Sequence, residues 1–311
     1  MSKSQKFKVQ SSKFKVQKTH EKLFAKKSLG QNFLVDENVI EEIIAAVDIR
    51  EGETIIEIGA GNGALTRNLT GKSAQVIAIE YDKDLIPVLK SELGERENFK
   101  LIHADALQLD WTQVINDSKP PQNLKSQATG KTKIVANLPY YISTAILQNL
   151  ITNRRHFSTL VLMLQREVVE RITAKPGNSE RGFLTVLIEA YCHVEKLFDV
   201  PPIAFRPVPK VSSSVIEMSF RETSLITSED LELLKLDYEN GENLFRQIVS
   251  CGFAQKRKTI ANNLKNSAPK LLENFDSRGG INEVLLKSEI EPNRRAETLT
   301  LDEWKKLAFG A

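Results

Sequence analysis

The stretch TIIEIGAGNGALT, residues 54–66, decides the fold of this chain. A short apolar run, 54–58, leads into three closely spaced glycines and then into a stretch with helical character. Gly59 and Gly61 allow the backbone to turn sharply and to approach a ligand closely. Ala64 completes the loose pattern G-x-G-x-x-G/A, which binds nucleotide-like ligands when it links a strand to a helix. The stretch therefore predicts a ligand site at the carboxyl end of a buried strand.

Short apolar runs alternate with helical stretches on the C-terminal side of this turn. Strands that alternate with helices predict βαβ units, and hence a doubly wound α/β domain with a parallel sheet covered on both faces. Two later runs, 194–200 and 213–220, are joined by a proline-rich link and predict an antiparallel pair at the sheet edge. The other expected strands are QVIAIE (75–80), KLIHAD (100–105), KIVANL (133–138) and TLVLML (159–164), with helices from about 63, 83 and 143, over 166–174 and over 183–191.

The rest of the chain divides into three further kinds of segment. Beyond about residue 225 the pattern is helical, with expected helices at 229–236, 242–253, 281–288 and 301–309. Residues 113–131 lack apolar periodicity and are expected to form a long surface loop. We therefore expect a flexible lysine-rich arm over 1–25, an α/β domain over 26–222 and a small all-helical domain over 223–311.

Composition excludes several classes of protein. The 311 residues are 41% hydrophobic, enough for a sizeable core. No run approaches the roughly 18 apolar residues of a membrane span, and no apolar signal segment follows the N-terminal lysines, so we expect a cytoplasmic protein without membrane contact. Cys192 and Cys251 have no CxxC partner and are expected to be core thiols, and the four histidines lack metal-ligand spacing, so no metal is expected.

Positive charge is gathered in clusters although the net charge is only +3. Any one cluster could be an ordinary solvated face, but several on a nearly neutral chain suit contacts with phosphate groups. The N-terminal cluster carries KFKVQ twice, and the sequence does not say what this repeat does. The clusters are the lysines of residues 1–20, Lys26-Lys27, Arg154-Arg155, QKRK (255–258) and Arg294-Arg295.

Acidic residues at the ends of the next two strands narrow the choice of cofactor. Glu80 lies 21 residues after Gly59, where a carboxylate can accept hydrogen bonds from both hydroxyls of a ribose. The glycines and Glu80 fit either a nicotinamide cofactor or S-adenosyl-L-methionine. Asp105 ends the third strand and can accept a hydrogen bond from an adenine amine, which favours S-adenosyl-L-methionine. Asp105 could instead simply cap a turn.

The fourth strand ends in an unusual corner, KIVANLPYYIS, residues 133–143. A methyl transfer to adenine N6 needs acceptors for the amine hydrogens, because the nitrogen lone pair is otherwise delocalised into the ring. Asn137 through its side-chain oxygen, and Leu138 or Pro139 through a backbone carbonyl, can supply them. Tyr140 offers an aromatic face on which a flipped base can stack. The alternative is a tyrosine that packs in the core after a proline turn.

These motifs resemble the ribosomal RNA adenine N6-dimethyltransferase family from about Lys26 to the C-terminus. The resemblance rests on SLGQNFLVD (28–36), EIGAGNGALT (57–66), NLPYYIS (137–143) and AFRPVPKVSSSV (204–215). It implies a Rossmann-like class I methyltransferase sheet and S-adenosyl-L-methionine as cofactor, with Asn32 and Leu34 lining the cofactor, Asn137 at the reacting nitrogen and Phe205 closing over the base opposite Tyr140. QKRKTIANNL and NRRAETLTLDEW further resemble bacterial members that dimethylate two adjacent adenosines in the 3′-terminal hairpin loop of small-subunit (16S) ribosomal RNA.

The resemblance implies a monomer that acts on small-subunit ribosomal RNA within a pre-30S particle and contributes to small-subunit biogenesis. Three alternatives stay open: a large-subunit ribosomal RNA adenine methyltransferase of the macrolide-resistance type, a non-catalytic RNA-binding assembly factor, and a nicotinamide oxidoreductase. NRRAETLTLDEW argues against the first. The lysine-rich arm and the 113–131 segment exceed the usual bacterial pattern, and the order of modification does not follow from the sequence.

Overall fold

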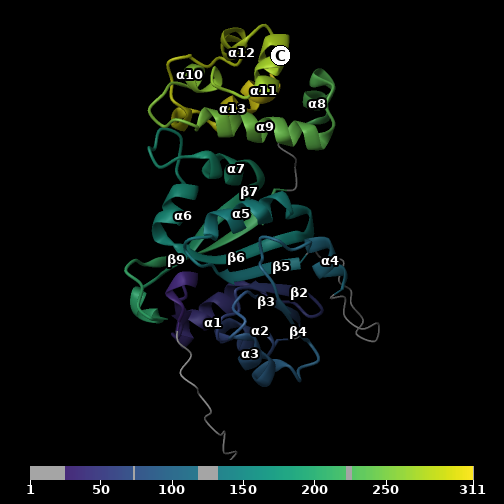
Figure 1. Cartoon of the computed structure of the whole chain (residues 1–311), viewed down its shortest axis with the longest axis vertical. Helices are drawn as coiled ribbons and strands as arrows, with labels where there is room; N and C mark the ends of the chain where they lie inside the picture. Colours follow the sequence, from purple (N-terminus) through teal and green to yellow (C-terminus); the bar gives the residue numbers. More distant parts are fainter. Residues whose placement is uncertain (1–24, 73, 118–131, 222–225, 311) are drawn as a thin grey trace, which may run out of the picture.

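A seven-stranded sheet forms the centre of the computed structural model, which describes residues 25–72, 74–117, 132–221 and 226–310 (Figure 1). Within these ranges the strand order is β4-β3-β2-β5-β6-β9-β7. β9 runs antiparallel to both its neighbours, β6 and β7, and the other neighbouring strands are parallel. The strands are β2 (Thr54–Ile58), β3 (Gln75–Glu80), β4 (Phe99–His103), β5 (Thr132–Asn137), β6 (Phe157–Gln165), β7 (Cys192–Val200) and β9 (Ser213–Phe220).

Alternating side chains along the strands decide which helices cover each face of the sheet. Successive residues of a strand point to opposite faces. Ile56 and Ile58 of β2 belong to the core cluster that includes α4 (Trp111–Asn116) and α5 (Ser143–Thr152), whereas Ile55 packs with α1 (Glu37–Ala46) and α2 (Ala64–Leu69). α3 (Ile86–Leu93) packs on Ala78 of β3. The sheet is therefore covered on both faces, which confirms the expected doubly wound α/β architecture.

The edge of the sheet also confirms the sequence prediction. β7 and β9 pair antiparallel from Cys192↔Phe220 to Val200↔Ser213, with β7 outermost. The proline-rich link between them forms a short 3-10 turn, Pro202–Ala204, and a two-residue strand, β8 (Phe205–Arg206). β8 pairs antiparallel with β1 (Phe33–Leu34). The sequence pattern did not predict this two-stranded sheet, the β1–β8 ribbon, because its strands are only two residues long and lie far apart in the sequence.

The chain beyond β9 is entirely helical where the structure describes it (Figure 1). The four helices expected there are present, and α10 and α11 are additional. α9 and α13 contact α7 (Phe183–Tyr191), so the helical part shares one continuous core with the sheet. The proposed boundary at 222/223 falls in a gap of the described residues and stays a prediction. The helices are α8 (Ser228–Leu234), α9 (Tyr238–Gly252), α10 (Ile260–Leu264), α11 (Pro269–Ser277), α12 (Ile281–Lys287) and α13 (Leu301–Phe309).

Two local expectations need correction. Residues 113–116 belong to helix α4 and not to a loop, because the Asp110 side chain caps the N–H groups of Thr112 and Gln113 and Val114 is buried. The helix expected from about 83 begins only at Ile86, since the Asp82 side chain accepts the N–H of Asp84 and holds a turn there. Residues 118–131 and the expected basic arm up to residue 24 lie outside the described residues.

Three remaining expectations can be compared with the residues that the structure describes. No helix in these ranges combines the length and the apolar character that a membrane crossing needs. Helix α6 (Arg166–Ile172) follows β6 directly, as the sequence predicts. Cys192 is buried, as expected of a core thiol, whereas Cys251 is only partly buried and its thiol lies 3.2 Å from the Asn263 carbonyl oxygen.

Candidate active site

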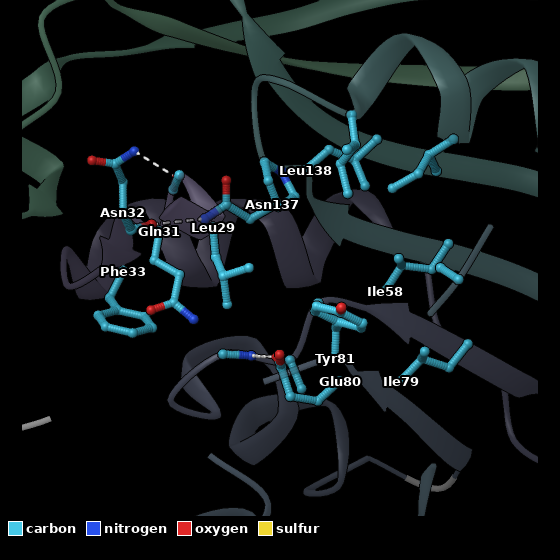
Figure 2. Close-up of a pocket in the computed structure, with 18 of the residues that line it drawn as sticks. Leu29, Gln31, Asn32, Phe33, Ile58, Ile79, Glu80, Tyr81, Asn137 and Leu138 are labelled. Carbon is cyan, nitrogen blue, oxygen red and sulfur yellow. Dashed lines mark hydrogen bonds between the residues drawn. The ribbon is translucent and has the colours of Figure 1, made fainter. Parts of the chain in front are cut away.

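A cavity of about 360 Å³ opens at the carboxyl ends of β2, β3, β4 and β5. In Figure 2, Leu29 to Phe33 lie on one side of it, across from Ile58 and Ile79, with Asn137 and Leu138 on a third side and Glu80 and Tyr81 on a fourth. Its volume falls within the range of about 300–1,000 Å³ that is usual for small-molecule sites. Ten of the predicted residues line it: Asn32, Leu34, Gly59, Gly61, Glu80, Asp105, Asn137, Leu138, Pro139 and Tyr140.

The glycine turn and Glu80 form one hydrogen-bonded unit. Gly59 and Gly61 have φ of 77° and 58°, a left-handed conformation that favours glycine. A Cβ on Gly61 would lie 3.4 Å from the ring of Phe33, at van der Waals contact, so the left-handed backbone and not crowding is what favours glycine here. The Gly61 N–H donates to Glu80 at 2.7 Å, and the second Glu80 oxygen accepts the Asp82 N–H at 2.7 Å. Burial raises the pKa of Glu80 above its ordinary value.

Asp105 caps a turn, which is one of the two roles that the sequence left open, and it also lines the cavity. Its side chain accepts the N–H of Leu107 at 2.9 Å, which caps the turn after β4. Its second oxygen accepts a longer hydrogen bond, 3.3 Å, from the Gln108 side chain. Because Asp105 also lines the cavity, this second oxygen is available to a ligand amine that replaces Gln108.

Backbone contacts hold the corner after β5 in one orientation. The Asn137 amide nitrogen donates to the Asn32 carbonyl at 3.2 Å, so the amide oxygen is the atom left to accept from a ligand. The Pro139 carbonyl accepts the Ile142 N–H at 3.2 Å. Within the described ranges no donor reaches the Leu138 carbonyl, although the Leu138 N–H is bound to Met163. The corner therefore offers two oxygen acceptors, one from Asn137 and one from Leu138.

Tyr140 follows these acceptors and is held from behind. Its hydroxyl lies 3.2 Å from the Ser213 hydroxyl at the start of β9, and burial raises its pKa. The ring is half-buried and lines the cavity. The tyrosine thus does not pack wholly in the core, which was the alternative left open by the sequence.

Phe205 is the predicted site residue that the structure does not bring to the cavity. Its side chain is 1% exposed and packs in the core cluster that contains Leu34 and Val215. Pairing of Phe205 with Leu34 across the β1–β8 ribbon accounts for this burial. A role for Phe205 over the target base stays a prediction.

Sequence reasoning missed several residues of the cavity wall. Phe33 stands between Asn32 and Leu34, and Gln31 precedes them. The direction of the Phe33 side chain depends on the β1–β8 pairing. Tyr81 and Tyr141 line the cavity and are 59% and 60% exposed. Each directly follows a predicted site residue, and an exposed aromatic next to a strand end is the signal that could have found them.

The donor set fits S-adenosyl-L-methionine. Glu80 and Asp105 are acceptors for hydroxyl and amine groups, the glycine turn permits close approach of a chain, and aromatic and aliphatic side chains form the remaining wall. No group of three or more His, Cys, Asp or Glu that could hold a metal ion occurs in the described parts of the chain.

Two solved structures share this fold over most of the chain. A dimethyladenosine transferase from Plasmodium falciparum is 24% identical with a TM-score of 0.68, covering 88% of this chain and 95% of that one. The 23S rRNA methyltransferase ErmE is 22% identical with a TM-score of 0.59, covering 89% and 98%. The fold is therefore that of the class I methyltransferases.

Comparison with known sequences shows to which family the chain belongs. The family model for ribosomal RNA adenine dimethylase matches residues 23–307. Proteins called ribosomal RNA small subunit methyltransferase A from Alkaliphilus oremlandii and Geobacillus sp. are 37% and 39% identical, each over 91% of this chain and 90% of the relative. One from Clostridium botulinum (strain Langeland) is 40% identical over 91% and 92%. The chain belongs to the ribosomal RNA adenine dimethylase family, and it is an S-adenosylmethionine-dependent enzyme.

Proposed function

We propose that this enzyme dimethylates N6 of two adjacent adenosines in the 3′-terminal hairpin loop of small-subunit ribosomal RNA, within a pre-30S particle. The observation that carries the proposal is the acceptor pair at the corner after β5, where the Asn137 amide is oriented by the Asn32 carbonyl at 3.2 Å. The relatives that cover most of the chain bear the small-subunit name, which supports this substrate over large-subunit RNA.

The corner would act by localising the lone pair of the reacting nitrogen. The amine of the target adenine donates one hydrogen to the Asn137 oxygen and one to the Leu138 carbonyl. Both acceptors then favour a pyramidal nitrogen whose lone pair points into the cavity. The Tyr140 ring fixes the plane of the base by stacking, worth about 1–3 kcal/mol. Bound S-adenosyl-L-methionine supplies an electrophilic methyl group on a positively charged sulfur.

The same acceptors give a reason for product release. Each methyl group removes one N–H donor from N6, so a finished dimethyladenosine leaves both the Asn137 oxygen and the Leu138 carbonyl without a partner. An unsatisfied polar group in a closed site costs about 1–3 kcal/mol. The product is therefore held less tightly than the substrate.

The remaining site roles are part of the proposal. Glu80 accepts from the ribose through the lone pairs that Gly61 and Asp82 do not use, and Asp105 accepts from the adenine amine of the cofactor. Asn32 and Leu34 cover the cofactor. The helical part over 223–311 docks RNA, and the enzyme works as a cytoplasmic monomer.

Methylation assays on separated ribosomal subunits test the substrate. Small and large subunits that lack adenine dimethylation are incubated with the enzyme and S-adenosyl-L-methionine, and the RNA is then read by reverse transcriptase. Dimethylation removes both N6 donors, so it stops the transcriptase at the modified bases. We expect a stop in the 3′-terminal hairpin of the small subunit, at the first dimethylated base that the transcriptase meets. Stops only in large-subunit RNA would favour the macrolide-resistance type, and RNA binding without stops would favour an assembly factor.

A further inference from the structure

The wall of the cavity that lies outside the sheet is a short segment with little structure of its own. This strap, residues 26–34, contains one 3-10 turn, Lys27–Leu29, and the two-residue strand β1. Six of its residues, 29–34, line the cavity. Since so short a segment cannot hold its own shape, its position depends on what anchors it.

The two ends of the strap are anchored in different ways. The C-terminal end is held by backbone hydrogen bonds, through the β1–β8 pairing and a 2.9 Å bond from the Val35 N–H to the Ala204 carbonyl. The N-terminal end is held mainly by side chains. Lys26 Nζ lies 2.5 Å from one Asp82 oxygen, and Gln31 Nε2 donates to the other at 2.8 Å. One carboxylate therefore fastens two points of the strap.

Asp82 is built into the protein in a way that suits an anchor. Its side chain is 3% exposed, and it also accepts the Asp84 N–H at 3.0 Å. Burial by itself would raise the pKa of Asp82, but the hydrogen bonds from Lys26, the Asp84 N–H and Gln31 outweigh it and lower the pKa. Within the strap, the Lys26 N–H donates to the Gln31 side-chain oxygen at 2.8 Å, so both partners of Asp82 are also tied to each other.

The anchor is continuous with the cofactor wall. The Asp82 N–H donates to Glu80, and the other Glu80 oxygen accepts from Gly61 at 2.7 Å. A chain of polar contacts thus runs from the glycine turn through Glu80 and Asp82 to the strap. Asp82 itself is not among the residues that line the cavity, so any effect on the cofactor must pass through the groups that it holds.

We propose that Asp82 is a positioning residue that clasps the strap over the cofactor cavity through Lys26 and Gln31, and so controls how long the cofactor stays bound. The proposal rests on the S-adenosyl-L-methionine assignment. It separates two steps of the reaction: the clasp governs binding and dissociation of the cofactor, whereas the Asn137–Leu138 corner governs methyl transfer. The corner contacts the strap at Asn32, next to β1, where the backbone pairing with β8 and not Asp82 holds the strap.

Binding and turnover of two variants of the full chain test the clasp. Asp82→Asn keeps the shape and the acceptor for Asp84, but it loses the charge that holds Lys26 and turns the acceptor for Gln31 into a donor. Lys26→Met removes the cation from a partly exposed position. We expect each to raise the Kd and the dissociation rate of S-adenosyl-L-methionine about tenfold, because hydrogen bonds to charged groups are the stronger class. At saturating cofactor, kcat should stay within about twofold of wild type.

Two comparisons show whether the clasp itself is responsible. The double variant should weaken binding by much less than the product of the single effects, since both remove the same contact. Asp84→Asn is the matched control: Asp84 is also 2.6 Å from Lys26 but is 59% exposed, so its loss should change Kd by less than about twofold. Additive effects, unchanged dissociation, or kcat falling in parallel with affinity would overturn the proposal. Failure of wild type to bind the cofactor would instead refute the assignment itself.

Discussion

At the residue scale, the sequence predicts which residues line the cavity where those residues come at or directly after the end of a strand. Gly59, Glu80, Asp105 and Asn137 meet because the carboxyl ends of neighbouring parallel strands share one edge. Phe205 could not be placed in this way. Its direction depends on pairing with Leu34, which is remote in sequence.

The free energy of unfolding should depend on pH through the buried carboxyl group of Glu57. This carboxyl in β2 is 1% exposed, and burial raises its pKa from 4.5 to about 8. Between these values the folded protein keeps a proton that the unfolded chain releases. The stabilisation is complete below the unfolded pKa and is lost as the pH rises through the folded pKa.

Thermal unfolding of Glu57→Gln checks this expectation. The amide mimics the protonated acid, so the stability of the variant should not fall in this way as the pH rises. From about pH 6 to about pH 9, the Tm of wild type should fall by several degrees relative to the Tm of Glu57→Gln. Glu41→Gln, at an exposed position of α1, should keep the wild-type profile. Parallel curves for wild type and Glu57→Gln would mean that Glu57 is ionised throughout.

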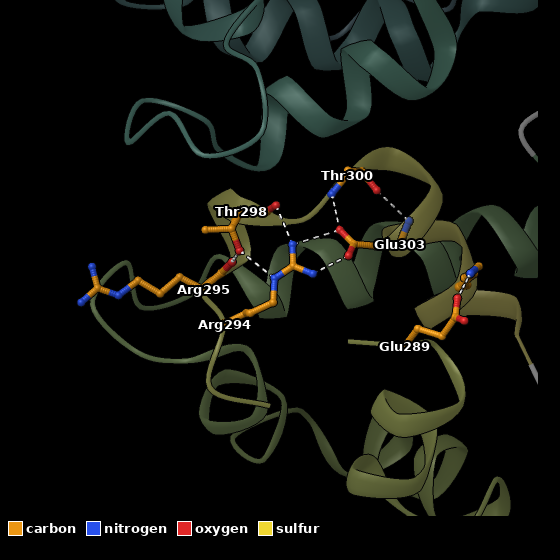
Figure 3. A network of polar contacts seen from close by, with 7 residues as sticks. Glu289, Arg294, Arg295, Thr298, Thr300 and Glu303 are labelled. Carbon is orange, nitrogen blue, oxygen red and sulfur yellow. Dashed lines mark hydrogen bonds and ion pairs between the residues drawn. The ribbon is translucent and has the colours of Figure 1, made fainter. Parts of the chain in front are cut away.

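At the element scale, the strands and most helices could be predicted because each carries its own apolar period or cap. The basic clusters were less predictable, since charge in a sequence does not show its partner. Arg294 forms an ion pair with Glu303 and donates to the Thr298 carbonyl at 2.8 Å, which secures the start of α13 (Figure 3). Arg295 points away from this network. Of these two neighbouring arginines, Arg295 is therefore the one that is exposed and can contact a partner molecule.

The turn between α9 and α10 keeps its whole cluster exposed, so we expect it to contact RNA phosphates. Lys256, Arg257 and Lys258 are all exposed, and the 3.9 Å pair between Lys256 and Glu180 is solvated on both sides. Replacing all three by alanine should weaken RNA binding and reduce the slope of log affinity against log salt by up to about 3.

Arg294→Ala is the matched control for the loss of basic charge. It should lower the Tm, because the Glu303 carboxylate loses its partner, and leave the salt slope close to wild type. An unchanged slope in the triple variant would exclude the α9–α10 turn from the RNA interface.

At the scale of the whole molecule, the helical part and the sheet are joined by packing and by charged contacts, of which the Arg154–Glu242 pair is more buried than the Lys256–Glu180 pair. Arg154 forms an ion pair with Glu242 of α9, and its guanidinium lies 4.3 Å from the centre of the Tyr191 ring. Both charged side chains are less than 20% exposed. From the sequence, Arg154 could be identified only as one member of a basic cluster with Arg155. The arrangement of the two parts required the folded chain, because contacts between remote segments leave no local pattern.

The central claim is that this fold uses the Asn137 corner to methylate adenine N6, and single-turnover methyl transfer tests it most directly. Tritium-labelled S-adenosyl-L-methionine is mixed with small subunits that lack the modification, and labelled nucleosides are separated. Wild type should give labelled N6-methyladenosine as the intermediate and N6,N6-dimethyladenosine as the final product, and Asn137→Ala should transfer methyl about 100-fold more slowly or worse, with RNA binding retained. A wild-type rate for Asn137→Ala, or label in any nucleoside other than these two, would contradict the account.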